Sequence, residues 1–197
     1  MLILVFMLTA CAGGTKPSDH TKEEAGEDES TSSESTDTTS IGAREAVKSF
    51  ELLTSEGNQS LDAALQHGKG FSLYVFENFT FDAATGRLSL SSNPGYYVEI
   101  EALPSDYELA QLETAGEDEL RQFGEMHNYS GELVEHPLGF AELYLQVSGK
   151  EGISDYIVWK SESGDAFLFR LHNPKGEEAS HFAGPVLTSL STVQSES

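Results

Sequence analysis

The sequence of 197 residues contains a single cysteine, Cys11, close to its N-terminus. The rest of the chain therefore offers no disulfide, no cysteine ligands for a metal ion and no thiol nucleophile. A domain without disulfides must draw its stability from its hydrophobic core alone.

Positive charge is also scarce. The chain has 11 lysines and arginines against 33 aspartates and glutamates, a net charge of −22. Residues 43–197 alone hold nine basic and 25 acidic residues. This balance argues against a nucleic-acid partner, whose binding needs basic side chains to displace counterions, and against direct docking on anionic lipid. The acidity serves solubility or attracts cations and basic partners, and composition leaves both alternatives open.

Long hydrophobic runs are missing as well. The first ten residues, MLILVFMLTA, are apolar, but a helix needs about 20 such residues to cross a hydrocarbon core of about 30 Å. Met1–Ala10 is instead typical of the apolar region of a signal peptide. Because signal peptides begin with a positive stretch and no basic residue precedes Lys16, we expect the true start codon to lie upstream of Met1.

The segment Leu8-Thr9-Ala10-Cys11 resembles the lipobox of bacterial lipoproteins. The resemblance implies cleavage before Cys11 and attachment of a diacylglycerol to its sulfur. Two acyl chains suffice for stable anchoring where one is marginal. We therefore expect a protein anchored to the cell membrane through Cys11 and exposed on the extracytoplasmic face.

Residues 11–42 consist mainly of serine, threonine, acidic residues and glycine. Such a composition cannot form a core and predicts a disordered tether after the lipidated cysteine. A flexible coil of about 30 residues averages roughly 30 Å between its ends. Residues 43–197 have the length of one domain.

The apolar pattern predicts secondary structure along this domain. Val47, Phe50 and Leu53 indicate an amphipathic helix over residues 43–53, and a second short helix is expected over 60–66. Ser105 and Glu108 form the pattern of a capping box, which predicts a helix over residues 105–123. The closing helix, over 177–193, would bury one stripe and be kinked or restarted at Pro185. The residues of that stripe are Phe182, Val186, Leu190 and Val193.

Alternating residues and turn signals predict the strands. They are expected over residues 71–76, 79–81, 88–90, 96–103, 132–135, 140–147, 156–161 and 166–172, the last two as a hairpin. Strands that follow one another, with separate helices, favour an α+β fold. We expect one antiparallel sheet of about six strands flanked by helices.

The segment Gly70-Phe-Ser-Leu-Tyr-Val75, the turn and second strand after it, the helix after Leu103-Pro104, the hairpin around Trp159 and the C-terminal helix resemble the PsbP-like fold. The resemblance covers roughly residues 69–193. It implies a sandwich around an antiparallel sheet. It implies no activity, because a fold does not fix a function. Bacterial members are often envelope lipoproteins of unassigned role, which agrees with the lipobox.

No phosphate-binding loop, nucleophile elbow or zinc-protease motif occurs in the sequence. A zinc pair of His172 and His181 is the one metal hypothesis among the histidines, against the ordinary surface or capping role. The run Glu117-Asp118-Glu119 suggests calcium, but consecutive helical side chains point in different directions. The prediction is no catalytic, metal or cofactor site. The five histidines of the domain are His67, His127, His136, His172 and His181.

Aromatic residues are dense between positions 71 and 97. They pair across strands in the core, or some of them line a groove. The anchor, the tether and the lack of a catalytic motif lead us to expect a non-catalytic accessory or interaction domain with an envelope protein as partner. The alternative is a module that binds a small ligand or a cation, with an enzyme in third place. The aromatic residues are Phe71, Tyr74, Phe76, Phe79, Phe81, Tyr96 and Tyr97.

Overall fold

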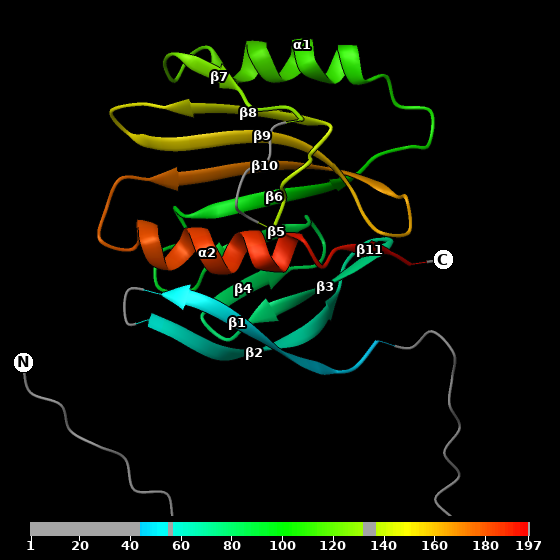
Figure 1. The fold of residues 1–197 in the computed structure, drawn as a ribbon, viewed down its shortest axis with the longest axis vertical. Helices are drawn as coiled ribbons and strands as arrows, with labels where there is room; N and C mark the ends of the chain where they lie inside the picture. The colour runs from blue at the N-terminus through cyan, green and yellow to red at the C-terminus, as the bar shows by residue number, and fades with distance from the viewer. Residues whose placement is uncertain (1–43, 55–56, 132–136, 197) are drawn as a thin grey trace, which may run out of the picture. The chain divides into compact units, whose positions relative to one another are not determined.

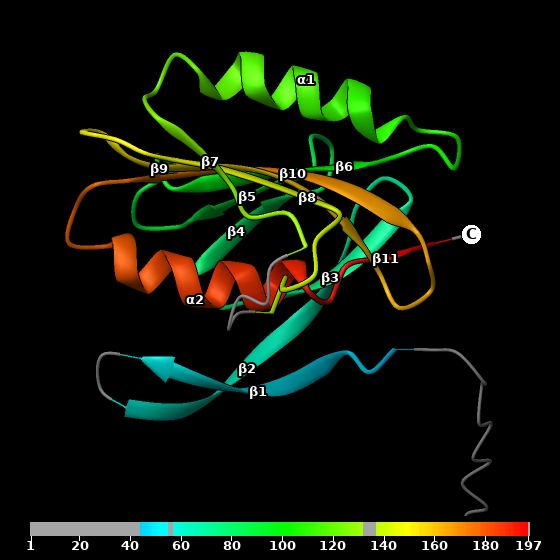
Figure 2. The same ribbon diagram turned by 45° about the horizontal axis from the view of Figure 1, so that its top comes forward.

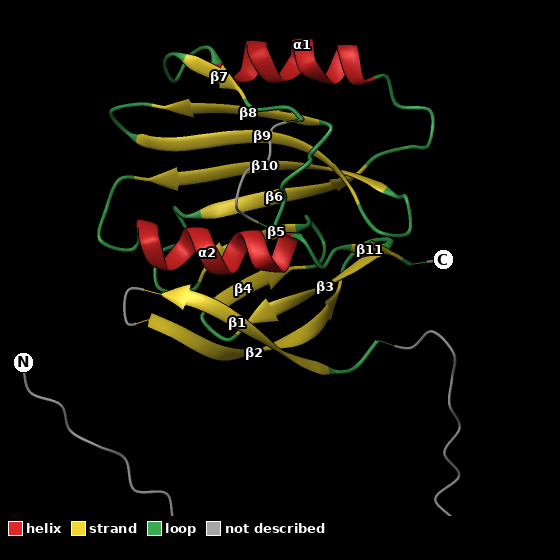
Figure 3. Ribbon diagram, viewed as in Figure 1, coloured by secondary structure: helices red, strands yellow, loops and turns green. Residues whose placement is uncertain are grey.

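Two antiparallel sheets and two helices build the domain in the computed structural model, which describes residues 44–54, 57–131 and 137–196. Residue contacts group Gly42–Ser197 as one compact unit. The predicted signal segment, Cys11 and the tether lie outside the described residues. Six strands are followed by a helix, four strands, a second helix and a last strand, as Figures 1 and 3 show. Their bounds are β1 (Val47–Thr54), β2 (Gly57–His67), β3 (Phe71–Phe76), β4 (Phe79–Asp82), β5 (Arg87–Leu90), β6 (Tyr97–Ala102), α1 (Leu109–Leu120), β7 (Met126–Asn128), β8 (Leu143–Ser148), β9 (Gly152–Lys160), β10 (Ala166–Pro174), α2 (Ala179–Leu190) and β11 (Gln194–Ser195).

The seven-stranded sheet has the order β4-β5-β6-β10-β9-β8-β7, and the four-stranded sheet has the order β1-β2-β3-β11. Helix α1 lies on one face of the larger sheet and α2 on the other, as Figure 2 shows. Helix α2 also contacts β1 and β3, so it is packed between the two sheets. No helix within the described ranges has both the length and the apolar character needed to cross a membrane.

The main core surrounds α2. Phe182, Val186 and Leu190 of α2 are completely buried, which confirms the predicted stripe for these three residues. Val193 is also completely buried, but it follows the helix, which ends at Leu190 and not at residue 193. The helix runs as one element through Pro185, so a restart at that residue is not observed. A second cluster beneath α1 joins Leu120 to Leu145 and Tyr156 on the opposite face of the sheet.

The α+β class is confirmed, but the prediction of about six strands is wrong: the described residues form eleven strands in two sheets. The helices predicted over 43–53 and 60–66 are instead the β1–β2 hairpin. Phe50 and Leu52 turn to the core while Leu53 is 82% exposed, which is the alternation of a strand. Pairing of β2 with β1 before it and with β3 after it overrides the local helical spacing.

Helix α1 begins later than predicted. Its N-cap is Glu108, with no side-chain hydrogen bond, so the capping box at Ser105 is wrong. The backbone N–H of Tyr107 donates to the Pro104 carbonyl in a turn, and the Tyr107 hydroxyl donates to Glu142, the residue just before β8. These contacts hold the chain out of the helix until Leu109.

The predicted hairpin of residues 156–172 is confirmed as β9 and β10, joined by the turn after Lys160. The strand predicted from residue 140 begins only at Leu143, because Phe140 has a φ of 69° and cannot be extended. Strand β7 was not predicted from the sequence. The strand predicted over 132–135 lies outside the described residues.

Candidate ligand-binding pocket

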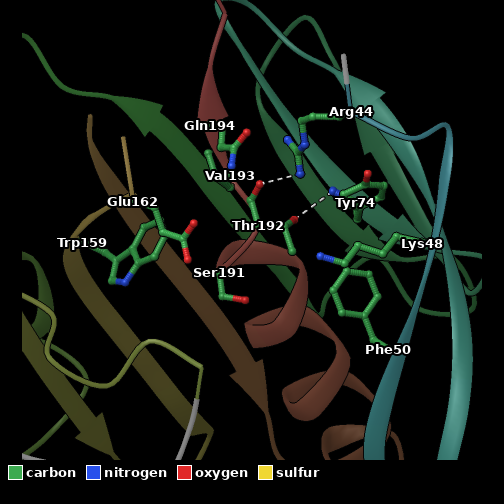
Figure 4. A pocket seen from close by; sticks show the side chains of 10 residues that line it. All are labelled: Arg44, Lys48, Phe50, Tyr74, Trp159, Glu162, Ser191, Thr192, Val193 and Gln194. Carbon is green, nitrogen blue, oxygen red and sulfur yellow. Dashed lines mark hydrogen bonds between the residues drawn. The ribbon is translucent and has the colours of Figure 1, made fainter. Parts of the chain in front are cut away.

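A pocket of about 360 Å³ opens where β1, β3, the β9–β10 hairpin and the residues after α2 meet (Figure 4). We call it the Arg44 pocket. One wall carries Arg44, Lys48, Phe50 and Tyr74, the opposite wall carries Trp159 and Glu162, and residues 191–194 lie between them. Its volume is at the lower end of the range of about 300–1,000 Å³ found for small-molecule sites.

Strand geometry places the first wall. Lys48 and Phe50 are two residues apart in β1, so they share one face of the sheet. The ring of Phe50 meets Tyr74 of β3 edge to face, with 5.7 Å between the ring centroids. The Tyr74 hydroxyl donates to the Glu45 carbonyl at 2.8 Å. The aromatic surface of this wall is therefore fixed before any ligand arrives.

Arg44 joins three segments of the chain. Its guanidinium donates to the carbonyl and the hydroxyl of Ser72, at 3.1 and 3.0 Å, and to the carbonyl of Thr192 at 2.8 Å. Its Cζ atom lies 4.5 Å from the centroid of the Tyr74 ring. All three groups that accept these hydrogen bonds are neutral. Their dipoles solvate the positive charge of Arg44 but do not cancel it.

Lys48 contributes a second positive charge beside the first. Its Nζ lies 5.3 Å from the centroid of Phe50 and 6.0 Å from that of Tyr74. No described carboxylate lies within 4.0 Å of Lys48 or Arg44. By contrast, Arg87, Lys160 and Arg170 each pair with a glutamate.

The opposite wall comes from the β9–β10 hairpin. Trp159, near the end of β9, is held against Phe169, with 6.2 Å between the ring centroids. Glu162 lies in the turn that follows, and Figure 4 shows its carboxylate directed towards the opening between the walls. Positive and negative groups thus face each other across the pocket without forming an ion pair.

The structure does not bring His172 and His181 together. The ring of His172 contacts Tyr97, and its neighbours include the α1 side chain Glu119. His181 belongs to α2, on the other face of the sheet, so the zinc pair is wrong.

The remaining histidines are also separate. His67 pairs with Glu196 at 2.6 Å, and His127 stacks on Tyr129, while His136 lies outside the described residues. Across the described ranges, no group of three or more histidine, cysteine or acidic side chains could hold a metal ion.

The acidic run of α1 uses different partners. Glu119 accepts a hydrogen bond from Arg170 at 3.2 Å, whereas Asp118 pairs with Arg121 at 3.0 Å. No shared calcium position results.

Most of the predicted aromatic set is core. Phe71, Tyr74, Phe76, Phe79 and Tyr96 are buried, and only Tyr74 among the seven also lines the Arg44 pocket. The sequence interpretation missed Arg44, Lys48 and Glu162 as site residues and assigned Phe50 to a helix. A strand reading of residues 47–54 would have placed Lys48 and Phe50 on one face.

A buried carboxylate lies elsewhere in the domain. Asp155 of β9 is 6% exposed and accepts a hydrogen bond from the side-chain amide of Gln146 at 2.8 Å. Burial raises the pKa of Asp155 from 3.8 to about 7, although the Gln146 hydrogen bond acts in the opposite direction. Burial, and then the nearby Asp155 charge, raises the pKa of Tyr144.

Residues 44–194 match the model of a protein family described as a domain of unknown function (DUF8580). The chain belongs to this family. A comparison with curated proteins found no match. The DUF8580 span begins at Arg44 and ends at Gln194, and both of these residues line the Arg44 pocket. The family domain therefore includes every residue of the pocket.

Arg44 is expected to matter for stability because it holds the start of this domain to β3 and to the chain after α2. Hydrogen bonds from a charged group contribute about 1.5–3 kcal/mol, so Arg44→Ala should lower the free energy of unfolding by about 2 kcal/mol. Arg121→Ala is the matched control: its side chain is 70% exposed, and a loss within about 0.5 kcal/mol is expected. Urea denaturation measures both, and equal losses would contradict the proposed role of Arg44.

Proposed function

We propose that the protein is an extracytoplasmic lipoprotein, anchored through Cys11, whose domain acts by binding, and that the Arg44 pocket receives an anionic group of a small ligand. The assignment of an anionic ligand rests on one observation. Arg44 and Lys48 lie together on one aromatic wall, and no described carboxylate neutralises them.

The net negative charge of the domain makes the position of these two cations informative. Residues 43–197 have 16 more acidic than basic residues, so carboxylates are abundant as partners for any basic side chain. Arg44 and Lys48 lack a carboxylate partner, so they create a local positive region on a domain whose overall negative field repels anions. A carboxylate or similar anion fits that region better than a metal cation does. This favours the small-ligand alternative over cation binding.

The anchor is supported by the lipobox at residues 8–11 and by the length of chain before the domain. The DUF8580 span begins at residue 44, which leaves residues 11–43 to separate the domain from the lipid. A PsbP-like relationship also stays a proposal, supported by the antiparallel sheet with a helix on each face.

Docking on an envelope protein is the second candidate function. At the other end of α2, Leu52, Leu53, Leu61 and Pro185 line an apolar groove of about 360 Å³. Leu53 is 82% exposed at its edge, and exposed apolar surface of this kind is typical of protein contacts.

The chain provides its own reporter for ligand binding, because Trp159 is its single tryptophan and lines the pocket. Hexanoate supplies a carboxylate with an apolar tail. Titration of the full chain with hexanoate should change the tryptophan fluorescence, and Lys48→Met should weaken binding about tenfold or more, the usual effect of losing a charged hydrogen bond.

Lys150→Met removes one exposed positive charge outside the pocket and should leave the affinity unchanged. Equal affinities in the wild type, Lys48→Met and Lys150→Met would contradict the assignment of the Arg44 pocket as an anion site, as would the absence of hexanoate binding.

A further inference from the structure

We infer that the Arg44 pocket takes a zwitterion: a small molecule with a carboxylate that binds on the Lys48 side and an amino group that binds between Trp159 and Glu162. The inference rests on the proposed function, because it adds a second charged contact to the same pocket.

The first observation is that the opposing charges remain separate. Glu162 forms no ion pair with any described residue, and Lys48 forms none either. The lysine of the same hairpin pairs with a different carboxylate: Lys160 Nζ lies 2.8 Å from Oε1 of Glu142. The negative group of Glu162 and the positive group of Lys48 therefore face each other across a pocket of about 360 Å³. A molecule that carries both charges compensates both at once.

The second observation is the distribution of cations over the aromatic rings. Arg44 lies over Tyr74 and Lys48 over Phe50, so the rings of the first wall already have cations of the protein itself. No described lysine or arginine lies over Trp159, the indole on the wall of Glu162. Tryptophan is the most favourable ring for a cation–π contact. An amino group placed there also meets the Glu162 carboxylate.

The third observation is that the two walls are held independently. The first wall is fixed through Arg44, Ser72 and Thr192, whereas Trp159 is fixed by Phe169 within the larger sheet. Since Lys48 and Glu162 belong to walls that are held by different contacts, each side chain can be changed without disturbing the other. The inference can thus be tested apart from the proposed function.

Three probes of matched length separate the contributions: 6-aminohexanoate carries both charges, hexanoate only the carboxylate, and hexylamine only the amine. Binding of each to the full chain is followed by Trp159 fluorescence and by calorimetry. We expect 6-aminohexanoate to bind at least tenfold more tightly than either of the others. Glu162→Gln should remove this advantage while leaving the affinity for hexanoate unchanged, and Lys48→Met should weaken hexanoate and 6-aminohexanoate alike.

Glu177→Gln removes an exposed carboxylate outside the pocket and should behave as the wild type with all three probes. If hexanoate and 6-aminohexanoate bind equally well in a Lys48-dependent manner, the zwitterion inference is overturned and the anion site stands. If neither binds, both are overturned. A preference for 6-aminohexanoate that survives Glu162→Gln also overturns the inference, because the amino group then binds elsewhere.

Discussion

Asp155→Asn is expected to raise the free energy of unfolding at pH 8 by about 2–4 kcal/mol. Asp155 is 6% exposed, and its pKa is about 7 in the folded chain against 3.8 for an unperturbed carboxyl. Each pKa unit corresponds to about 1.4 kcal/mol, so a shift of this size gives an upper limit of roughly 4 kcal/mol. Asparagine keeps the oxygen that accepts the Gln146 hydrogen bond and removes the buried charge.

The sign of the pH dependence follows from the raised pKa. The folded state holds the Asp155 proton more tightly than the unfolded state, so the contribution of this group to stability is fully present below about pH 4. It decreases as the pH rises towards 7 and is lost above the folded pKa. The advantage of Asp155→Asn over the wild type should therefore grow between pH 4 and pH 7 and then level off.

Urea denaturation at pH 4.5, 6 and 8 (chosen to span that window) measures this difference. Asp106→Asn, at an exposed position, is the control for a changed surface charge and should track the wild type. A stability difference between Asp155→Asn and the wild type that stays constant with pH would show that Asp155 is charged throughout, held by a contact beyond Gln146.

Local pattern was enough to predict two elements of the domain, the β9–β10 hairpin and the helix α2. The β9–β10 hairpin has a short turn between two apolar strands, and α2 has three buried apolar residues at helical spacing, Phe182, Val186 and Leu190. In both cases the period of the side chains agrees with the final packing. The sequence therefore predicted the central hairpin and the closing helix.

The β1–β2 hairpin shows where this reasoning stops. Val47, Phe50 and Leu53 have the spacing of a helix, yet Val47 is 53% and Leu53 82% exposed. The side chains that decide the conformation are Phe50 and Leu52, which contact the core around α2, well over 100 residues later in the chain. A window of a few residues carries no information about such a partner.

The Arg44 pocket was missed for the same reason. Its charged residues, Arg44, Lys48 and Glu162, follow no motif and come from opposite ends of the domain. The aromatic residues did lead to the hypothesis of a groove. Of that set of seven, Tyr74 is buried and also lines the Arg44 pocket. The site exists only because the fold brings distant segments of the chain together.

Cys11→Ser is expected to abolish lipid attachment completely and, with it, stable membrane association of the mature chain. Serine has no thiol to accept the diacylglycerol. Each methylene buried in the bilayer contributes about 0.8 kcal/mol, so loss of two acyl chains removes far more binding energy than any surface of the acidic domain can replace. Repulsion from anionic headgroups extends only about 8 Å at physiological salt, so it does not oppose the anchor itself.

Fractionation of cells and mass spectrometry of the N-terminal peptide test this prediction together. The wild type should be in the membrane fraction with a diacylglycerol on Cys11. The Cys11→Ser protein should be released, or it should keep residues 1–10 as an unprocessed precursor, and in neither case should its N-terminus carry lipid. Thr31→Ser, a conservative change in the predicted tether, should match the wild type. A Cys11→Ser protein that remains in the membrane fraction with the mature mass would refute the anchor, and would require the domain surface itself to hold the membrane despite its excess of acidic residues.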